Sequence, residues 1–176
     1  MAGHYLVELI TEKDIRSKVK ELGRQISRDY ETKSVFVIGV LKGSFVFLAD
    51  LIRELDIPAE VSFISLSSYA EGTTTSGSVR LLRGIDEQLE GRDLLIVEDI
   101  VDSGHTVAYL VEALGLRNPN SVRICALLDK PARRVLSVRT DYYGFEIGDE
   151  FVVGYGLDYA GKYRNLKSIS KVVFSE

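Results

Sequence analysis

The chain alternates stretches of helical and strand-like hydrophobic spacing. Apolar residues recur at helical intervals from residue 11 to residue 30, which predicts an amphipathic helix with Thr11 as its N-cap. Residues 34–41 form a short β-branched apolar run, which is typical of a strand buried on both faces. A second helix is predicted from about residue 45 to residue 55.

More strands and another helix follow. Residues 61–66 alternate between apolar and polar side chains, and residues 94–97 and 124–128 are continuous apolar runs, so each predicts a strand. Residues 107–116 have helical spacing. Strands that alternate with helices predict an α/β fold, with a largely parallel sheet covered by helices on both faces and ligands at the carboxyl ends of its strands. The C-terminal third, rich in Tyr, Gly and Phe, predicts a small subdomain over that edge.

Composition narrows the class of protein. A length of 176 residues predicts a single domain over 1–176, and the lone cysteine, Cys125, cannot form an internal disulfide, which suits a reducing compartment. The first ten residues do not resemble a signal peptide, and no apolar run is long enough for a membrane helix, so we expect a cytoplasmic protein. The net charge of -4 argues against nucleic acid or an anionic membrane as the main partner, but not against a small anion.

The most informative segment is 97–106, with the sequence VEDIVDSGHT. The carboxylates of Glu98, Asp99 and Asp102 follow an apolar strand, and such a group is retained where a cation, a sugar hydroxyl or proton transfer compensates for its repulsion. The amides of residues 103–106 open a helix and would hold a phosphate. A lone aspartate there would be read as an N-cap, but the whole string suits a ligand with a ribose diol and a phosphate.

This string resembles the phosphoribosyl pyrophosphate signature of the type I phosphoribosyltransferases, and its surroundings are similar to the hypoxanthine-guanine branch of that family. The similarity runs from about residue 35 to residue 166, through LKGS at 41–44, SY at 68–69, LLDK at 127–130, GFEI at 144–147, and FVVGYGLDY at 151–159. It implies a parallel-sheet core with a C-terminal hood, mostly from about 140–176. It also implies magnesium-dependent transfer of phosphoribose from phosphoribosyl pyrophosphate to N9 of hypoxanthine or guanine, giving IMP or GMP.

The resemblance assigns roles within the signature. Glu98 and Asp99 would hold the ribose hydroxyls and Mg²⁺, which prefers oxygen ligands and retained waters. Asp102 would act as general base or acid near N7 of the purine. The 5′-phosphate would be held by the turn that follows, formed by Ser103, Gly104, His105 and Thr106, with no proton transfer by the His105 side chain.

The pyrophosphate would be bound by loops outside the signature. The resemblance assigns it to Lys42 and Gly43, with a cis peptide before Lys42, and to Arg164. Ser68 and Tyr69 would form the hinge end of a lid at about 68–84, a polar segment without hydrophobic period that would exclude water from the site.

The purine would be bound mainly by the C-terminal block. Lys130 would donate to the exocyclic O6 of a 6-oxopurine, and adenine, which presents an amino donor there, would be rejected. The remaining purine contacts implied are Ile100, Phe151, Val152, Leu157 and Asp158. Phe151 and Ile100 would lie on opposite faces of the base, and Asp158 would also ligate a second Mg²⁺.

Other functions remain open from sequence alone. One is a relative that prefers xanthine, and another is a regulatory protein that keeps this fold but binds nucleotide and RNA. A dinucleotide-binding module has little support, because no G-x-G-x-x-G follows a strand. The resemblance also suggests a homodimer or homotetramer. Cys125 is expected to be an inert core residue, and His4 carries no inference.

Overall fold

The computed structural model describes residues 3–68 and 79–175, and it places a six-stranded sheet within them. The strand order is β4-β3-β2-β5-β6-β7. The strands are β2 (Val35–Leu41), β3 (Ala59–Ser68), β4 (Val79–Arg83), β5 (Asp93–Val101), β6 (Ser121–Asp129) and β7 (Tyr142–Glu146). All neighbouring pairs are parallel except β3 and β4. The predicted parallel sheet is confirmed, with one antiparallel edge strand.

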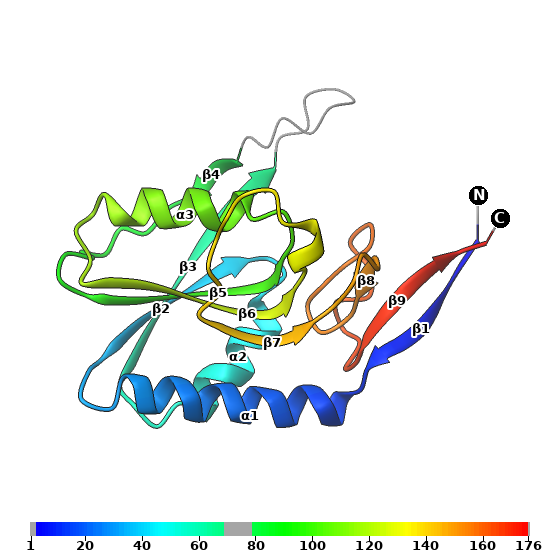
Figure 1. Ribbon diagram of the computed structural model, residues 1–176, viewed down its shortest axis with the longest axis horizontal. Coiled ribbons are helices and arrows are strands. Elements are labelled where there is room, and N and C mark those ends of the chain that lie inside the picture. The colour runs from blue at the N-terminus through cyan, green and yellow to red at the C-terminus, as the bar shows by residue number, and fades with distance from the viewer. Residues whose placement is uncertain (1–2, 69–78, 176) are drawn as a thin grey trace.

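Helices cover both faces of this sheet, as predicted (Figure 1). On one side lie α1 (Glu12–Asp29) and α2 (Phe45–Leu51), the latter continuing into the 3-10 helix η1 (Ile52–Glu54). On the other side lies α3 (His105–Gly115), and a second 3-10 helix, η2 (Pro131–Arg133), follows β6. Alternate residues of the central strands enter two separate hydrophobic cores, one beneath α1 and α2 and the other beneath α3. Both faces of β2 and β5 are therefore buried, which explains their uninterrupted apolar sequences.

A smaller sheet stands beside the main one. Its strand order is β1-β9-β8, formed by β1 (His4–Ile10), β9 (Ile169–Phe174) and β8 (Val152–Val153). The hood, expected mostly from about residue 140, starts later in the chain than predicted. β7 belongs to the main sheet, where Tyr142 pairs with Cys125 and is buried, and the N-terminal strand β1 completes the small sheet.

The expected lid at 68–84 is described only at its two ends. Ser68 is the last residue of β3, and β4 pairs with β3 in antiparallel register, from Ser68 opposite Val79 to Ser65 opposite Arg83. Tyr69 lies outside the described residues, as does the rest of the segment up to residue 78. Within the described part of the chain, no helix combines the length and the apolar character required to cross a membrane.

Candidate active site

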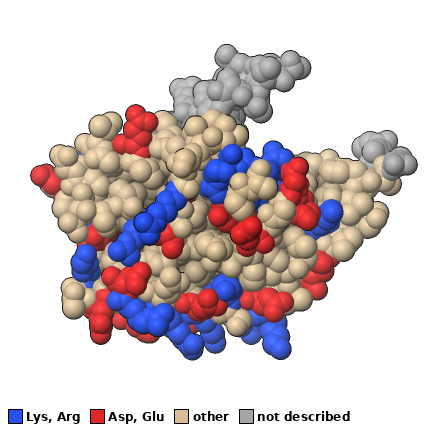
Figure 2. Space-filling view, in the orientation of Figure 1, with Lys and Arg blue, Asp and Glu red and all other residues tan. Residues whose placement is uncertain are grey.

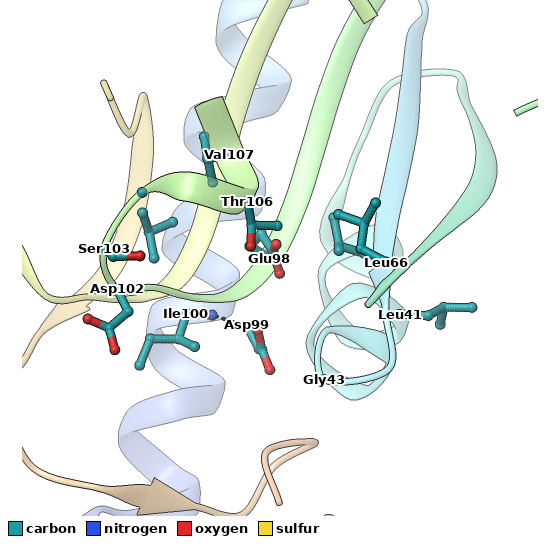
Figure 3. A pocket seen from close by; sticks show the side chains of 13 residues that line it. Leu41, Gly43, Leu66, Glu98, Asp99, Ile100, Asp102, Ser103, Thr106 and Val107 are labelled. Carbon is teal, nitrogen blue, oxygen red and sulfur yellow. Dashed lines mark hydrogen bonds between the residues drawn. The ribbon is translucent and has the colours of Figure 1, made fainter. Parts of the chain in front are cut away.

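Two adjoining hollows lie at the carboxyl edge of the main sheet, with volumes of about 310 Å³ and 560 Å³. The residues that line both are Leu41, Gly43, Leu66, Asp99, Ile100 and Asp102. The smaller hollow continues along the turn into α3, and the larger one continues under the hood. Because they share these residues, the two hollows form one site. Figure 3 shows the residues that line the smaller hollow, with Ile100 between Asp99 and Asp102.

Most of the residues predicted from sequence meet at these hollows. The smaller one is lined by Glu98, Ser103, Gly104 and Thr106, and the larger one by Lys42, Lys130, Phe151, Val152, Leu157, Asp158 and Arg164. His105, partly buried at the start of α3, is not among the described residues that line either hollow, although its neighbours on both sides are. This placement agrees with giving its side chain no chemical role.

The turn after β5 is shaped for an anion. Gly104 has a φ of 91°, and a Cβ there would lie 2.9 Å from the carbonyl oxygen of Leu136. Glycine is required on both counts. The carbonyl of Ser103 accepts hydrogen bonds from the amides of Val135 and Leu136 at 3.0 Å and 3.1 Å, so the segment after β6 braces the turn. Residues at the start of α3 line the smaller hollow, and the free amides of a helix N-terminus favour a phosphate there.

Glu98 and Asp99 form a buried acidic pair at the end of β5. Glu98 is 5% exposed, and its pKa is raised well above the usual range by burial and by the neighbouring Asp99. Burial also raises the pKa of Asp99, whose Oδ1 accepts a hydrogen bond from the amide of Ile100 at 2.8 Å. Two carboxyls in this environment, close to an open hollow, are stabilised in their charged form by a bound cation.

The acidic pair has the chemistry of a hard-cation site. Among the described residues, no cluster of three or more Asp, Glu, His or Cys side chains is placed to hold a metal. A cation at Glu98 and Asp99 would therefore take its remaining ligands from water or from oxygens of a substrate, which is how Mg²⁺ is commonly bound.

The loop after β2 approaches this pair closely. The Leu41–Lys42 peptide is cis. A Cβ on Gly43 would lie 1.5 Å from Oδ2 of Asp99, and a Cβ on Gly156 would lie 2.2 Å from the Gly43 carbonyl oxygen. Because neither position has room for a side chain, the backbone of the β2 loop is packed directly against the Asp99 carboxyl, and the backbone of the hood is packed against the β2 loop.

The larger hollow presents a buried cation and an exposed aromatic ring. Lys130 is 6% exposed, and its Nζ donates to the carbonyl of Glu150 at 2.6 Å. Phe151 is 47% exposed, with the ring of Tyr159 in edge-to-face contact at 5.6 Å. A lysine has three donors, so Lys130 retains donors for a ligand, and the Phe151 ring is free to stack on a flat ligand.

Arg164 and Asp158 pair at the far side of the larger hollow. Nη2 of Arg164 lies 2.6 Å from Oδ1 of Asp158, and Nη1 donates to the carbonyl of Gly156 at 2.6 Å. The other oxygen of Asp158 accepts from the amide of Gly161 at 2.7 Å. A cation bound by Asp158 would compete with Arg164, so this carboxylate fits a metal less well than Glu98 and Asp99 do.

Arg133 is a site residue that the sequence analysis missed. Its Nε donates to Oδ1 of Asp102 at 2.8 Å, and the same guanidinium pairs with Asp149. A signal was present in the sequence, since two arginines, Arg133 and Arg134, lie within five residues of the end of β6 at the ligand-binding edge. Arg134 pairs instead with Asp129.

Comparisons with known proteins agree with this site. Residues 8–160 match the family described as phosphoribosyl transferase domain. The chain is 49% identical over 172 residues to the hypoxanthine phosphoribosyltransferase of Salmonella typhimurium, covering 97% of each. It is 49% identical over 161 residues to the hypoxanthine-guanine phosphoribosyltransferase of Bacillus subtilis, covering 92% of this chain and 89% of the relative. A crystal structure of a Bacillus anthracis hypoxanthine-guanine phosphoribosyltransferase has a TM-score of 0.91 at 49% identity, covering 95% of this chain and 98% of that one.

Proposed function

This chain belongs to the phosphoribosyltransferase family, and we propose that it transfers phosphoribose from phosphoribosyl pyrophosphate to N9 of hypoxanthine or guanine. The products are IMP or GMP and pyrophosphate, a reaction of purine salvage. Its sheet and helices form the type I phosphoribosyltransferase fold. One observation carries the proposal: an anion-binding turn with an acidic pair adjoins a hollow that presents a buried lysine and an exposed phenylalanine.

The larger hollow suits a 6-oxopurine. Lys130 donates to O6 of hypoxanthine or guanine, while Phe151 and Ile100 contact the two faces of the ring. Val152, Leu157 and Asp158 line the remainder. The amino group of adenine would face the Lys130 ammonium, so that two hydrogen-bond donors meet. This mismatch costs far more binding free energy than the loss of an apolar contact.

The smaller hollow suits the phosphoribosyl group. The amides and hydroxyls from Ser103 to Thr106 hold the 5′-phosphate, and Glu98 and Asp99 hold the ribose hydroxyls and Mg²⁺. When bound, Mg²⁺ supplies positive charge that favours departure of pyrophosphate. Lys42, Gly43 and Arg164 contact the pyrophosphate.

Asp102 lies where the two hollows meet, and we assign it the proton exchanged at N7 of the purine. Its carboxyl is 40% exposed and lines both hollows, so it is accessible to a base bound on the Lys130 side. A positioned carboxylate of this kind contributes about 10²- to 10⁴-fold to a rate.

The RNA-binding alternative has less support. A protein that binds RNA through its phosphates needs a stripe or patch of basic side chains. On the face shown in Figure 2, the coloured basic residues are interspersed with acidic ones. The relatives described above are named for a transferase activity.

Assembly and location complete the proposal. We expect a homodimer or homotetramer, which size-exclusion chromatography with light scattering would measure. We expect a cytoplasmic location, which suits Cys125, a free and buried cysteine.

The proposal is tested by product identification. The purified chain is incubated with phosphoribosyl pyrophosphate, Mg²⁺ and hypoxanthine, and the products are analysed by mass spectrometry. We expect IMP and pyrophosphate in equal amounts, and no turnover when EDTA removes the metal. A folded chain that makes no nucleotide product with hypoxanthine, or with guanine in its place, would rule the proposal out.

Gly43→Ala tests the close approach of the β2 loop to Asp99. The added Cβ would displace the Asp99 carboxyl, so we expect kcat/KM to fall by at least about tenfold, the scale of a misplacement well under 1 Å. Gly115→Ala is the matched control, because a Cβ at Gly115, in α3, meets no atom within 4 Å. Equal kinetics for the two variants would show that the close approach is irrelevant to the site.

Phe151→Leu tests the stacking role of the exposed ring. Base–aromatic stacking is worth about 1–3 kcal/mol, so KM for hypoxanthine should rise by about 5- to 150-fold with little change in Tm. Phe174→Leu is the control, since Phe174 is also about half exposed, at 51%, and packs on the same Tyr159 at 5.8 Å. If both variants raise KM equally, the effect comes from the aromatic cluster and not from stacking on the base.

A further inference from the structure

Arg133 joins three segments of the chain next to Asp102. It is the last residue of η2, and its guanidinium contacts Asp102 in the turn after β5 and Asp149 just before β8. Among the described side chains, those of residues 3–66 and 84–175, no second one hydrogen bonds to Asp102. The orientation of the Asp102 carboxylate is therefore set by Arg133.

The hydrogen bond from Arg133 occupies only one of the two oxygens of the Asp102 carboxylate. Nε of Arg133 donates to Oδ1 of Asp102 at 2.8 Å, and the second oxygen remains for a ligand. Three residues earlier, Lys130 donates to the carbonyl of Glu150. The short segment 130–133 thus holds residues 149 and 150 of the hood with one basic side chain at each end.

This ion-pair network is too exposed to contribute much to folding. The side chains of Arg133, Asp102 and Asp149 are 49%, 40% and 71% exposed. Ion pairs in such positions stabilise a protein by only about 0–1 kcal/mol. Hydrogen bonds to Asp149 and Asp102 raise the pKa of Arg133, which keeps its charge at any assay pH. Because the network adds little stability, its main effect is to hold the Asp102 carboxylate in position.

We propose that Arg133 is a positioning residue, which orients the Asp102 carboxylate toward the purine and fixes the β5–α3 turn against Asp149 of the hood. The inference rests on the transfer reaction proposed above. Proton exchange with N7 depends on a donor and acceptor held in line, and a carboxylate free to rotate spends much of its time misaligned. Arg133 prevents that rotation by holding one oxygen of the Asp102 carboxylate, and it leaves the other oxygen free to exchange a proton with the purine.

The first test compares two arginines of the same connecting segment. Arg133→Ala should lower kcat for hypoxanthine by about tenfold, a part of the contribution made by a positioned acid or base. Tm and the Kd for phosphoribosyl pyrophosphate should stay close to the wild-type values. Arg139→Ala removes the same charge from a side chain that is 87% exposed and should retain wild-type kcat. Arg133→Lys, which keeps the charge and one donor, should restore part of the loss.

A double-mutant cycle asks whether Arg133 acts through Asp102. In an Asp102→Asn background, Arg133→Ala should have almost no further effect on kcat, because the group that it positions no longer exchanges a proton. Independent losses that multiply in the double variant would overturn the inference. So would wild-type kcat in Arg133→Ala, or an equal loss in Arg139→Ala. Wild-type protein without 6-oxopurine turnover would instead overturn the proposed function, and this inference with it.

Discussion

Asp102→Asn is expected to lower kcat for hypoxanthine by about 10²- to 10⁴-fold, the contribution of a positioned general acid or base. Asparagine has nearly the same size and retains an oxygen that can accept from Nε of Arg133. The geometry of the turn should therefore survive, and the change is confined to the ability to exchange a proton. Binding of phosphoribosyl pyrophosphate should weaken far less than kcat falls, because the turn amides and Glu98 and Asp99 are unaltered.

The measurement is steady-state kcat together with calorimetric titration of phosphoribosyl pyrophosphate in the presence of Mg²⁺. Asp149→Asn is the matched control, since Asp149 pairs with the same arginine but does not line either hollow among the described residues. The kcat of Asp149→Asn should fall by less than about tenfold, because this substitution can affect only the position of Asp102. An unchanged kcat in Asp102→Asn would remove Asp102 from the proton-transfer role.

Lys130→Met should produce the largest change in base selectivity. The variant keeps an apolar stem in a position that is 6% exposed, but it loses the donor to O6 of the purine and to the Glu150 carbonyl. Removing a charged hydrogen-bond donor in a buried site costs about 1.5–3 kcal/mol or more, so kcat/KM for hypoxanthine should fall by about 10²-fold. The kcat/KM for adenine should not fall in parallel, because the ammonium opposes adenine in the wild type.

The ratio of kcat/KM for hypoxanthine to that for adenine is the quantity to measure. Lys171→Met, on the exposed side of β9, is the control for loss of a positive charge from the hood and should leave the ratio unchanged. A Lys130→Met variant that discriminates between the two bases as well as the wild type does would contradict the assignment of Lys130 to O6.

The elements of the main sheet could be predicted because their pattern is local. The first helix starts after Thr11, whose side chain accepts from the amide of Asp14 at 3.1 Å as an N-cap does. The second helix was expected to reach about residue 55, but it tightens into η1 after Leu51. Its final turn is a 3-10 turn, which is frequent at helix ends.

The small sheet could not be predicted from local pattern. β1 pairs with β9, so that His4 lies opposite Phe174 at the other end of the chain. Three of its apolar residues, Tyr5, Val7 and Leu9, are exposed. The positions of apolar residues in this strand therefore do not indicate which of its side chains are buried. Only the pairing with β9 explains why this segment is a strand, and β1 and β9 lie side by side (Figure 1).

The site shows the same division between local and non-local information. The residues from Glu98 to Thr106 lie close together because they are contiguous in the chain, so this part of the site could be predicted directly from its sequence motif. The contacts of Arg133 with Asp102 and of Gly43 with Asp99 join residues far apart in sequence. Such contacts depend on the order of strands in the sheet, which places the β2, β5 and β6 loops at one edge.

The central claim is that one site joins phosphoribosyl pyrophosphate to a 6-oxopurine, and it is tested most directly by comparing bases in a single assay. The kcat/KM of the wild-type chain is measured spectrophotometrically with hypoxanthine, guanine, xanthine and adenine, at saturating phosphoribosyl pyrophosphate and Mg²⁺. We predict efficient turnover of hypoxanthine or guanine and a kcat/KM for adenine lower by at least about 10³-fold. Turnover of adenine in preference to both 6-oxopurines would contradict the account.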